Sequence, residues 1–348
     1  KMWGYRVISS QLSGPSRGIW VNTQNSFSSI FSGYNNGLQV LTIDENGIGS
    51  GVQDFTLSNF TASDDNLWQF DGFYDVSGSG LQSILAAPCQ NLNSISSTVN
   101  TPVLIGSITG TTMSQIGVFT ASATTVNTNA TITLAASNPL IGAGQTISGT
   151  GIQAGTTVVS VVTTTVVMSL PATASGTVTL TFNNNVSVSG GVVSLHPYVF
   201  VYGNDGLIKN CAAGNAQDWV SADANETNVA TGKIVQGLPV RGGSNAPSGL
   251  FWSLDSLIRV SYIGGQGTPA QYWRYDIISS QSSILSSQSA IEYDGIYYWC
   301  GVDRFLMYNG VVKEIPNTMN QNYFFDNLNY AQRQKVWVSK VPRFGEIW

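Results

Sequence analysis

IEYDGIYYWCGVDRFLMYNG, residues 291–310, has a hairpin pattern from which the fold of the chain can be predicted. Ile296–Cys300 predicts a short apolar strand, Gly301–Arg304 a turn and Phe305–Tyr308 a returning strand, after which Asn309-Gly310 signals a second turn. Its aromatic residues suit a pleated, half-buried surface. Because one hairpin cannot bury its own face, this stretch predicts similar hairpins elsewhere in the chain.

Two stretches of the C-terminal half repeat this aromatic pattern. Tyr198–Ile208 predicts a hairpin with a turn at Gly203–Gly206, and Leu257–Ile277 predicts one with a longer loop. The predicted first strands of the three hairpins begin at Tyr198, Leu257 and Ile296, so the spacings between them are 59 and 39 residues. Irregular repeats near this spacing, with about four short strands each, are typical of propeller blades. The same pattern predicts N-terminal strands at Gly18–Asn22, Gly37–Asp44, Leu67–Asp71 and Leu81–Leu85.

The composition changes sharply in the middle of the chain. No Asp, Glu, Lys or Arg occurs from Val76 to Asn204, and Phe119 and Phe182 are the only aromatic residues from about 108 to 185. Alternation and β-branched residues predict strands at 130–134, 156–162, 165–169 and 176–182. We therefore predict an all-β fold with three parts. They are the first blades of an irregular β-propeller-like body (1–107), an inserted neutral β-sandwich-like module (108–187) and further blades (188–348).

The composition limits the possible functions. Charged residues make up 9% of the chain, against roughly 25% in ordinary globular proteins, whereas 42% are hydrophobic. This favours a β-protein of the extracellular or virion kind over disorder. A net charge of −5 argues against a protein that grips nucleic acid with a basic patch, but fits one past which DNA slides. No apolar run approaches the about 20 residues of a membrane span.

Metal and cofactor sites have little support in the sequence. An odd number of scattered cysteines predicts no disulfide scaffold, so we interpret Cys89, Cys211 and Cys300 as buried free thiols made in a reducing cell. His196, the single histidine, is interpreted as a structural or surface residue. The glycines of Gly149–Gly155 approach a dinucleotide-binding pattern, but β-branched segments flank them where a strand and a helix are required. We expect neither a metal nor a cofactor.

Carboxylate pairs are the remaining enzymatic candidates, because propellers can hold glycosidases with two acids about 5–9 Å apart. The pairs closest in sequence are Asp64/Asp65, Glu292/Asp294 and Asp44/Glu45. Neighbouring acids on a strand point to opposite faces, and acids in turns usually cap the backbone. We therefore predict no catalytic residue and no enzyme. Asp205 and Asp303 could bind a cation, but turn geometry explains them without one.

A helix is predicted near the C-terminus. Asn329 and Gln332 form a capping-box pattern that begins a helix over Tyr330–Lys335. Strands are predicted to follow at Val336–Ser339 and Phe344–Trp348.

Residues Ala290–Trp348 resemble the nozzle proteins of short-tailed bacteriophages, also called tail tubular protein B. The resemblance rests on EYDGIYYW at 292–299, VDRFLMYNG at 302–310, FDNLN at 325–329 before the helix, and PRFGEIW at 342–348. In the family, a comparable helix precedes a strand of the type F-x-E-V-W-W. The chain stops inside that strand, so we expect it to be a piece of a longer polypeptide. The neutral segment 144–182 resembles a module inserted in phage structural proteins, and suggests an outward-facing decoration.

The resemblance implies a structural virion protein that forms a six-fold ring at the tip of the tail. The ring would contact adaptor or portal-side tail proteins and tail fibres or spikes. Viral DNA would cross its lumen during ejection, without sequence-specific binding. The protein would reside in the virion tail after assembly in the host bacterial cytoplasm.

Two alternatives remain open. Exposed tryptophans and tyrosines could stack on sugars in a receptor-binding or adhesin module, although we predict that most of the nine tryptophans pack in the core and between blades. A glycan-degrading propeller enzyme would use acids such as Asp64 or Glu292.

Overall fold

The computed structural model describes residues 11–23, 27–58, 60–61, 66–76, 82–92, 94–107, 113–241, 246–316 and 321–348. These residues are almost entirely in antiparallel strands, which confirms the predicted all-β class. Helical structure in the described part is limited to the α-helix α1 (Gln321–Asp326) and the 3-10 helices Asn204–Gly206 and Tyr330–Lys335.

Five sheets have four strands each, and within every sheet the strands pair in the order in which they occur along the chain. We call them blades 1 to 5. Blade 1 has β1 (Gly18–Thr23), β2 (Phe27–Tyr34), β3 (Gly37–Asp44) and β4 (Gln53–Asp54); blade 2 has β5 (Asn66–Tyr74), β6 (Gln82–Asn91), β8 (Leu104–Ser107) and β9 (Ser114–Gln115); blade 3 has β17 (Gly191–Leu195), β18 (Tyr198–Tyr202), β19 (Leu207–Asn210) and β20 (Asn225–Asn228); blade 4 has β21 (Ile234–Pro239), β22 (Ser248–Ser253), β23 (Leu257–Gln266) and β24 (Gln271–Ser279); blade 5 has β25 (Ala290–Tyr293), β26 (Ile296–Cys300), β27 (Phe305–Tyr308) and β28 (Val312–Glu314). This repetition is the predicted propeller-like architecture.

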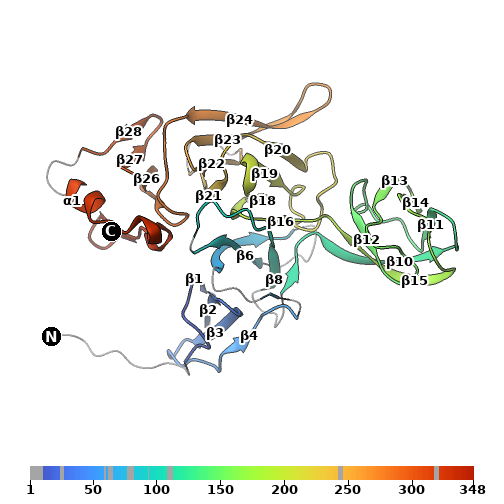
Figure 1. The fold of residues 1–348 in the computed structure, drawn as a ribbon. Coiled ribbons are helices and arrows are strands. Elements are labelled where there is room, and N and C mark those ends of the chain that lie inside the picture. The colour runs from blue at the N-terminus through green and yellow to red at the C-terminus, as the bar shows by residue number, and fades with distance from the viewer. Residues whose placement is uncertain are drawn as a thin grey trace.

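The blades follow one another in an arc, from β1–β4 in blue to β25–β28 in orange (Figure 1). The first strand of each blade is the innermost one: β1 contacts β5, β5 contacts β17, β17 contacts β21, and β21 contacts β25. Strands β26 and β27 have the predicted bounds. Leu257, by contrast, begins a third strand, whereas Tyr198 and Ile296 begin second strands. The second strands of blades 3, 4 and 5 begin at Tyr198, Ser248 and Ile296, which are 50 and 48 residues apart. The repeat is therefore more regular than the predicted spacings of 59 and 39 residues suggested.

An apolar layer fills the space between consecutive blades. On β18, Tyr198, Phe200 and Tyr202 face blade 4, whereas Val199 and Val201 face blade 2, because successive side chains of a strand point to opposite faces. Both faces of the strand are therefore buried. Most described tryptophans belong to these layers, as predicted: Trp68 between blades 1 and 2, Trp219 between blades 2 and 3, Trp273 between blades 3 and 4, and Trp252 and Trp299 between blades 4 and 5.

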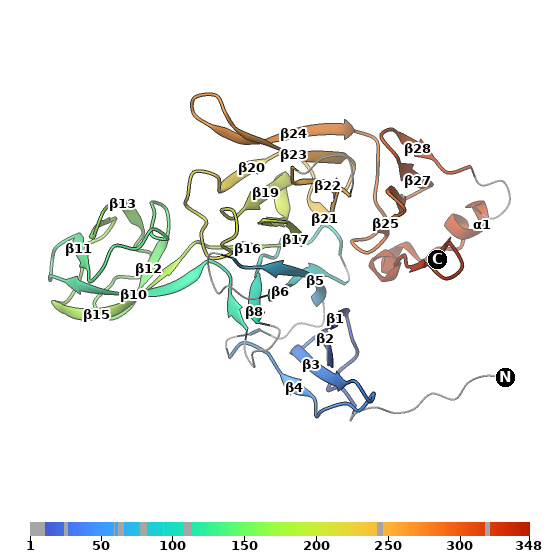
Figure 2. The same ribbon diagram turned by 180° about the vertical axis from the view of Figure 1, so that it is seen from behind.

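The neutral segment folds as a separate six-stranded sheet that projects from blades 2 and 3, in green in Figures 1 and 2. Its strands, in the order in which they pair, are β12 (Thr146–Ser148), β15 (Gly176–Asn183), β10 (Val118–Thr125), β11 (Thr131–Leu134), β14 (Thr165–Met168) and β13 (Val158–Val162). The two edges also meet, since Ile147 N–H donates to Thr156 O at 2.9 Å. The sheet thus wraps around its own apolar core, which includes Ile132, Leu180 and Phe182.

The sheet of this module is shorter than the predicted range 108–187. At its start, β9 pairs with β8 and so belongs to blade 2. At its end, β16 (Ser187–Val188) pairs with β7 (Thr101–Pro102). The glycine-rich stretch Gly149–Gly155 connects β12 to β13, so it lies between strands, as its flanking residues predicted.

The C-terminal segment continues the arc beyond blade 5. The predicted helix is present as the 3-10 helix Tyr330–Lys335, and the Asn329 side chain accepts a hydrogen bond from Ala331 N–H at 3.2 Å. Gln332 does not complete the capping box, because its side chain accepts from Lys335 Nζ at 3.1 Å instead. Helix α1 was not predicted. The strand expected at Val336–Ser339 begins later, at β29 (Lys340–Val341), which pairs with β30 (Glu346–Ile347).

Candidate functional site: the groove at the centre of the blades

Inner strands from all five blades line one groove of about 520 Å³. The segments that line it are Gly18–Ile19, Trp68–Asp71, Val192–Val193, Gln236–Pro239, Ser287–Gln288 with Ala290, and Trp337–Ser339. The last segment belongs to no blade. It borders the same groove as Gly18–Ile19 of blade 1, and the C-terminal part of the chain, in red, lies on the open side of the arc (Figures 1 and 2). It therefore takes the place of a sixth inner strand.

The hydroxyl of Tyr202 joins three blades beside this groove. It donates a hydrogen bond to Gln69 Oε1 at 2.7 Å in blade 2 and accepts one from Gly237 N–H at 3.0 Å in blade 4. The other end of the Gln69 amide donates to Val235 O at 3.1 Å. Complete burial raises the pKa of Tyr202 far above its ordinary value. The phenol therefore stays neutral and acts as a fixed donor and acceptor between blades.

Asp71 is the carboxylate that lines the groove. Burial raises its pKa, while hydrogen bonds from Ser194 N–H at 2.7 Å and Gly72 N–H at 2.8 Å, and the charge of Arg241, act in the opposite direction. The bond to Ser194 attaches blade 2 to blade 3. Glycoside hydrolysis needs two carboxyl groups that flank the sugar bond, and the described lining of the groove contributes one.

Glu292, a predicted candidate acid, lies near the groove in an ion-pair cluster. Its carboxylate is 3.8 Å from Arg241 Nε and 3.8 Å from Lys340 Nζ, and it accepts a hydrogen bond from Gly295 N–H at 2.9 Å. Its predicted partner Asp294 is in the turn between β25 and β26, where Asp294 (φ 54°) and Gly295 (φ 77°) both have left-handed backbone. This is the geometry of a type I′ hairpin turn, which favours Asp followed by Gly. The turn therefore explains Asp294 without a catalytic role.

The other acids singled out in the sequence have turn or surface roles where they are described. Asp44 accepts hydrogen bonds from Asn46 N–H and Ile48 N–H at 3.0 and 2.7 Å, and Glu45 is exposed in the same turn. Asp205 has left-handed backbone in the turn before β19. The hydrogen bonds from Arg304 lower the pKa of the exposed Asp303. Asp64 and Asp65 lie outside the described residues.

The cysteines and the histidine agree with the sequence interpretation. Cys89, Cys211 and Cys300 are free and buried. Burial raises the pKa of Cys89 and of Cys300 to about 12, and also raises that of Cys211. His196 is exposed in the turn between β17 and β18. No cluster of three or more His, Cys, Asp or Glu side chains suited to a metal ion occurs within the described ranges.

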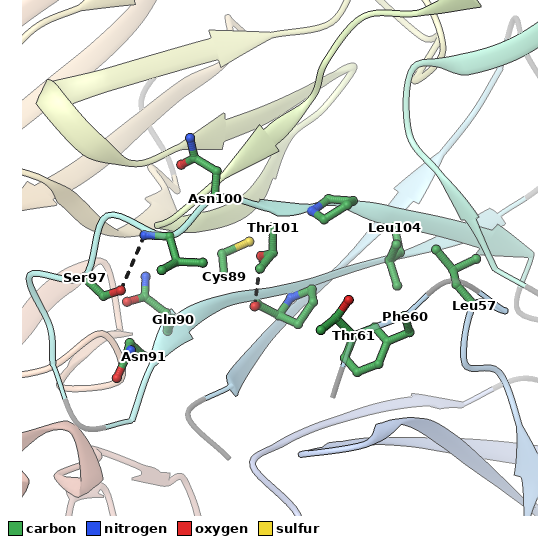
Figure 3. Close-up of a pocket in the computed structure, with 13 residues that line it drawn as sticks. Leu57, Phe60, Thr61, Cys89, Gln90, Asn91, Ser97, Asn100, Thr101 and Leu104 are labelled. Atoms are coloured by element: carbon green, nitrogen blue, oxygen red, sulfur yellow. Dashed lines mark hydrogen bonds between the residues drawn. The ribbon is translucent and has the colours of Figure 1, made fainter. Parts of the chain in front are cut away.

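A second cavity, of about 440 Å³, lies beside β6 (Figure 3). Leu57, Phe60 and Leu104 form an apolar wall, and Cys89 and Gln90 come from β6. Figure 3 also shows the hydrogen bonds that shape its rim, from Thr101 Oγ1 to Pro88 O at 2.9 Å and from Val99 N–H to Ser97 Oγ at 3.4 Å.

No local pattern in the sequence indicated the buried amine next to this cavity. Lys233 is 5% exposed, and its Nζ donates to the carbonyl oxygen of Ser97 at 2.9 Å. Burial lowers the pKa of Lys233 to about 8. From local sequence alone, a lysine at the start of an apolar strand is expected to be exposed at the end of that strand. Its burial depends on the loop at Ser97, which is far away in the sequence.

Comparisons with known proteins leave the family open. No family model matches this sequence, and no curated protein matches it. Among solved structures, the chain is similar to "Phage phi92 endosialidase" at 13% sequence identity and a TM-score of 0.26. The match covers 88% of this chain and 48% of that one, so this chain spans about half the length of the endosialidase. A similarity this distant assigns no function. Within the described chain, no helix has the length and apolar character needed to cross a membrane.

Proposed function

We propose that this chain is a structural subunit of a bacteriophage tail, and that six copies form a ring-shaped nozzle through which the genome is ejected. The observation that carries the proposal is the pattern over 290–348, which resembles nozzle proteins and spans blade 5 and the C-terminal segment. In this proposal the chain is not an enzyme, and adaptor or portal-side proteins and fibres or spikes are its neighbours in the virion.

The architecture supports a mechanical role. The layers between blades are apolar and joined by buried hydrogen bonds such as those of Tyr202, and close-packed interiors transmit load with little deformation. The neutral module projects from this body (Figure 1), which leaves it accessible to other tail proteins. A net charge of −5 per chain would let DNA pass without being retained by phosphate contacts.

Electron microscopy of intact virions tests this proposal. An antibody fragment raised against residues 118–183 would mark the module. We expect six labels in one ring at the tip of the tail, around a lumen wide enough for duplex DNA. A single copy, or a trimeric fibre that carries the label, would contradict the nozzle.

A receptor-binding module that recognises cell-surface glycans is the second candidate. Trp337 favours it, because this side chain is 62% exposed at the central groove, close to the polar groups of Gln288 and Arg241. Aromatic rings beside hydrogen-bonding groups are suited to binding sugars. Glycan-array binding that is lost in Trp337→Ala and retained in Val311→Ala, a residue of similar exposure, would favour this function over the nozzle.

The third candidate, a glycan-degrading enzyme, is tested by a different measurement. It requires the release of reducing sugars, abolished by Glu292→Gln or by replacement of Asp64. In our proposal the charge of Glu292 serves the ion pairs with Arg241 and Lys340, so we expect no such activity to be present.

A further inference from the structure

A further cavity, of about 310 Å³, lies at the outer rim of blades 3 and 4. Its lining comes from β20 and β24, the last strands of these two blades, and from residues next to them, within 222–227 and 270–275. Strand β24 extends with β23 beyond the body as a long hairpin, which is orange in Figures 1 and 2. We call this cavity the rim cavity. None of its described lining residues borders the central groove.

Strand β24 contributes aromatic side chains to the rim cavity. Tyr272 and Tyr275 are half-buried, and Trp273 is 4% exposed. The ring of Trp273 packs edge-on against those of Tyr198 and Phe200, with centroids 4.9 and 4.7 Å apart. Because these rings belong to the apolar layer between blades 3 and 4, the aromatic side of the cavity is held in place before a ligand binds. Such pre-organisation reduces the entropy cost of binding.

Strand β20 contributes polar side chains, namely Asn225, Glu226 and Thr227. Asn225 Nδ2 donates a hydrogen bond to the hydroxyl of Tyr275 at 3.0 Å, which joins the two strands. A buried donor also remains, because Nε1 of Trp273 has no hydrogen-bond partner among the described residues. An unsatisfied buried N–H costs free energy. A hydroxyl group bound in the rim cavity would accept its hydrogen bond.

We propose that the rim cavity binds a neutral saccharide, as a site separate from Trp337 and the central groove. Sugar rings have apolar C–H faces that pack on aromatic side chains, and hydroxyl groups that form hydrogen bonds with amides and carboxylates. Both kinds of side chain line the rim cavity. Its volume is at the lower end of the range for small-molecule sites and suits a short segment of a sugar chain. This binding does not depend on the formation of a nozzle.

The charges favour a neutral sugar over an acidic one. Glu226 is the charged residue of the described lining, and a carboxylate repels an anionic ligand. Lys209 pairs with Glu226 at 3.1 Å, and Arg274 pairs with Asp276 at 2.8 Å. Each of these neighbouring cations therefore already has an anionic partner, which leaves an acidic sugar without a strong counter-charge.

A peptide that adds to β20 as a further strand fits this site less well. Strand β20 has four residues, Asn-Glu-Thr-Asn. Short, polar edge strands are poor templates for strand addition. The lining therefore favours a sugar over a peptide.

Isothermal titration calorimetry of the full chain tests the proposal. The probes are neutral oligosaccharides of glucose, galactose, mannose and N-acetylglucosamine, and acidic oligosaccharides of sialic acid and glucuronic acid. We expect at least one neutral probe to bind, and no acidic probe to bind comparably. Tyr272→Ala removes a lining ring and should weaken binding of that probe at least about tenfold. Ala270→Trp fills the rim cavity from an exposed position and should abolish binding, which makes it the decisive variant should Tyr272→Ala fail to fold.

Two control variants should bind the neutral probe as the intact chain does. Tyr323→Ala removes a tyrosine of α1 that is 73% exposed, and Trp337→Ala removes the exposed aromatic residue of the central groove. Loss of binding in Trp337→Ala would overturn the proposal and assign the sugar to the central groove. Absence of binding to every neutral probe, equal binding of the acidic probes, or full binding in Ala270→Trp would also overturn it. The number of copies in the virion affects none of these results, so the nozzle is tested separately.

Discussion

Tyr202→Phe isolates the hydrogen bonds that join blades 2, 3 and 4. The substitution removes one oxygen and keeps the buried ring in its apolar layer with Phe251. Gln69 Oε1 loses its donor, and the buried N–H of Gly237 loses its acceptor. The change therefore tests polar contacts between blades separately from packing.

The expected magnitude follows from these contacts. Each intramolecular hydrogen bond contributes about 1 kcal/mol net, and a buried donor left without an acceptor costs about 1–3 kcal/mol. The lost bond to Gln69 costs about 1 kcal/mol and the unsatisfied N–H of Gly237 about 1–3 kcal/mol, so we expect a decrease of about 2–4 kcal/mol in the free energy of unfolding. Gln69→Ala removes one of the same bonds, so the double variant should lose less than the sum of the two single variants.

Urea unfolding followed by tryptophan fluorescence measures this decrease, since no tryptophan is changed. We expect a lower midpoint at an unchanged dependence on urea. Tyr308→Phe is the matched control, because Tyr308 is also buried between blades and its hydroxyl has no hydrogen-bond partner among the described residues. The control should change stability by less than about 0.5 kcal/mol. Equal effects of Tyr202→Phe and Tyr308→Phe would refute the reasoning.

Three further predictions concern buried groups. Burial lowers the pKa of Lys233 from 10.5 to about 8. Between these two pH values the unfolded chain binds a proton that the folded chain lacks, so the stability of the folded chain rises with pH in this range. Lys233→Met should thus stabilise the chain by about 1 kcal/mol more at pH 7 than at pH 9 in urea titrations; a pH-independent effect would contradict this. Burial raises the pKa of all three cysteines, so a thiol reagent at pH 7 should label none before unfolding and three afterwards; rapid labelling of the folded chain would be inconsistent with it. In Gly33→Ala the new Cβ would lie 2.1 Å from Trp68 Cγ, and we expect a loss of about 2–3 kcal/mol that lowers the melting temperature, whereas Gly51→Ala, with open space around it, should leave the melting temperature unchanged.

Local patterns in the sequence predicted strands and turns where apolar alternation is strong. The bounds of β26 and β27 agree because an apolar run and a turn signal coincide there. Strand β10, VFTASATT, was missed because small polar residues hide its alternation. Helix α1 is short, and Phe325 holds it against Leu285 and Cys300 of the blade 5 region. Its stability comes from that packing rather than from helix propensity.

The candidate site was less predictable than the fold. Sequence reasoning examined acids that are neighbours in the chain, because no other pairing can be read from one sequence. Tyr202 and Gln69, which meet beside the groove, are 133 residues apart. Ser194 and Asp71 are 123 apart. Lys233 is buried under a loop 136 residues away. Contacts of this kind leave no periodic signal.

Alternation, turn residues and charge are local properties of the chain, and they were sufficient to predict a β-protein of repeated aromatic hairpins interrupted by a neutral sheet. Local patterns could not show that the first strands of the blades surround one groove, that Trp337–Ser339 takes the sixth position there, or which face of each strand meets which neighbour. The reason is physical. Burial, hydrogen bonding and pKa depend on groups brought together by folding, and these come from blades that are distant in the sequence.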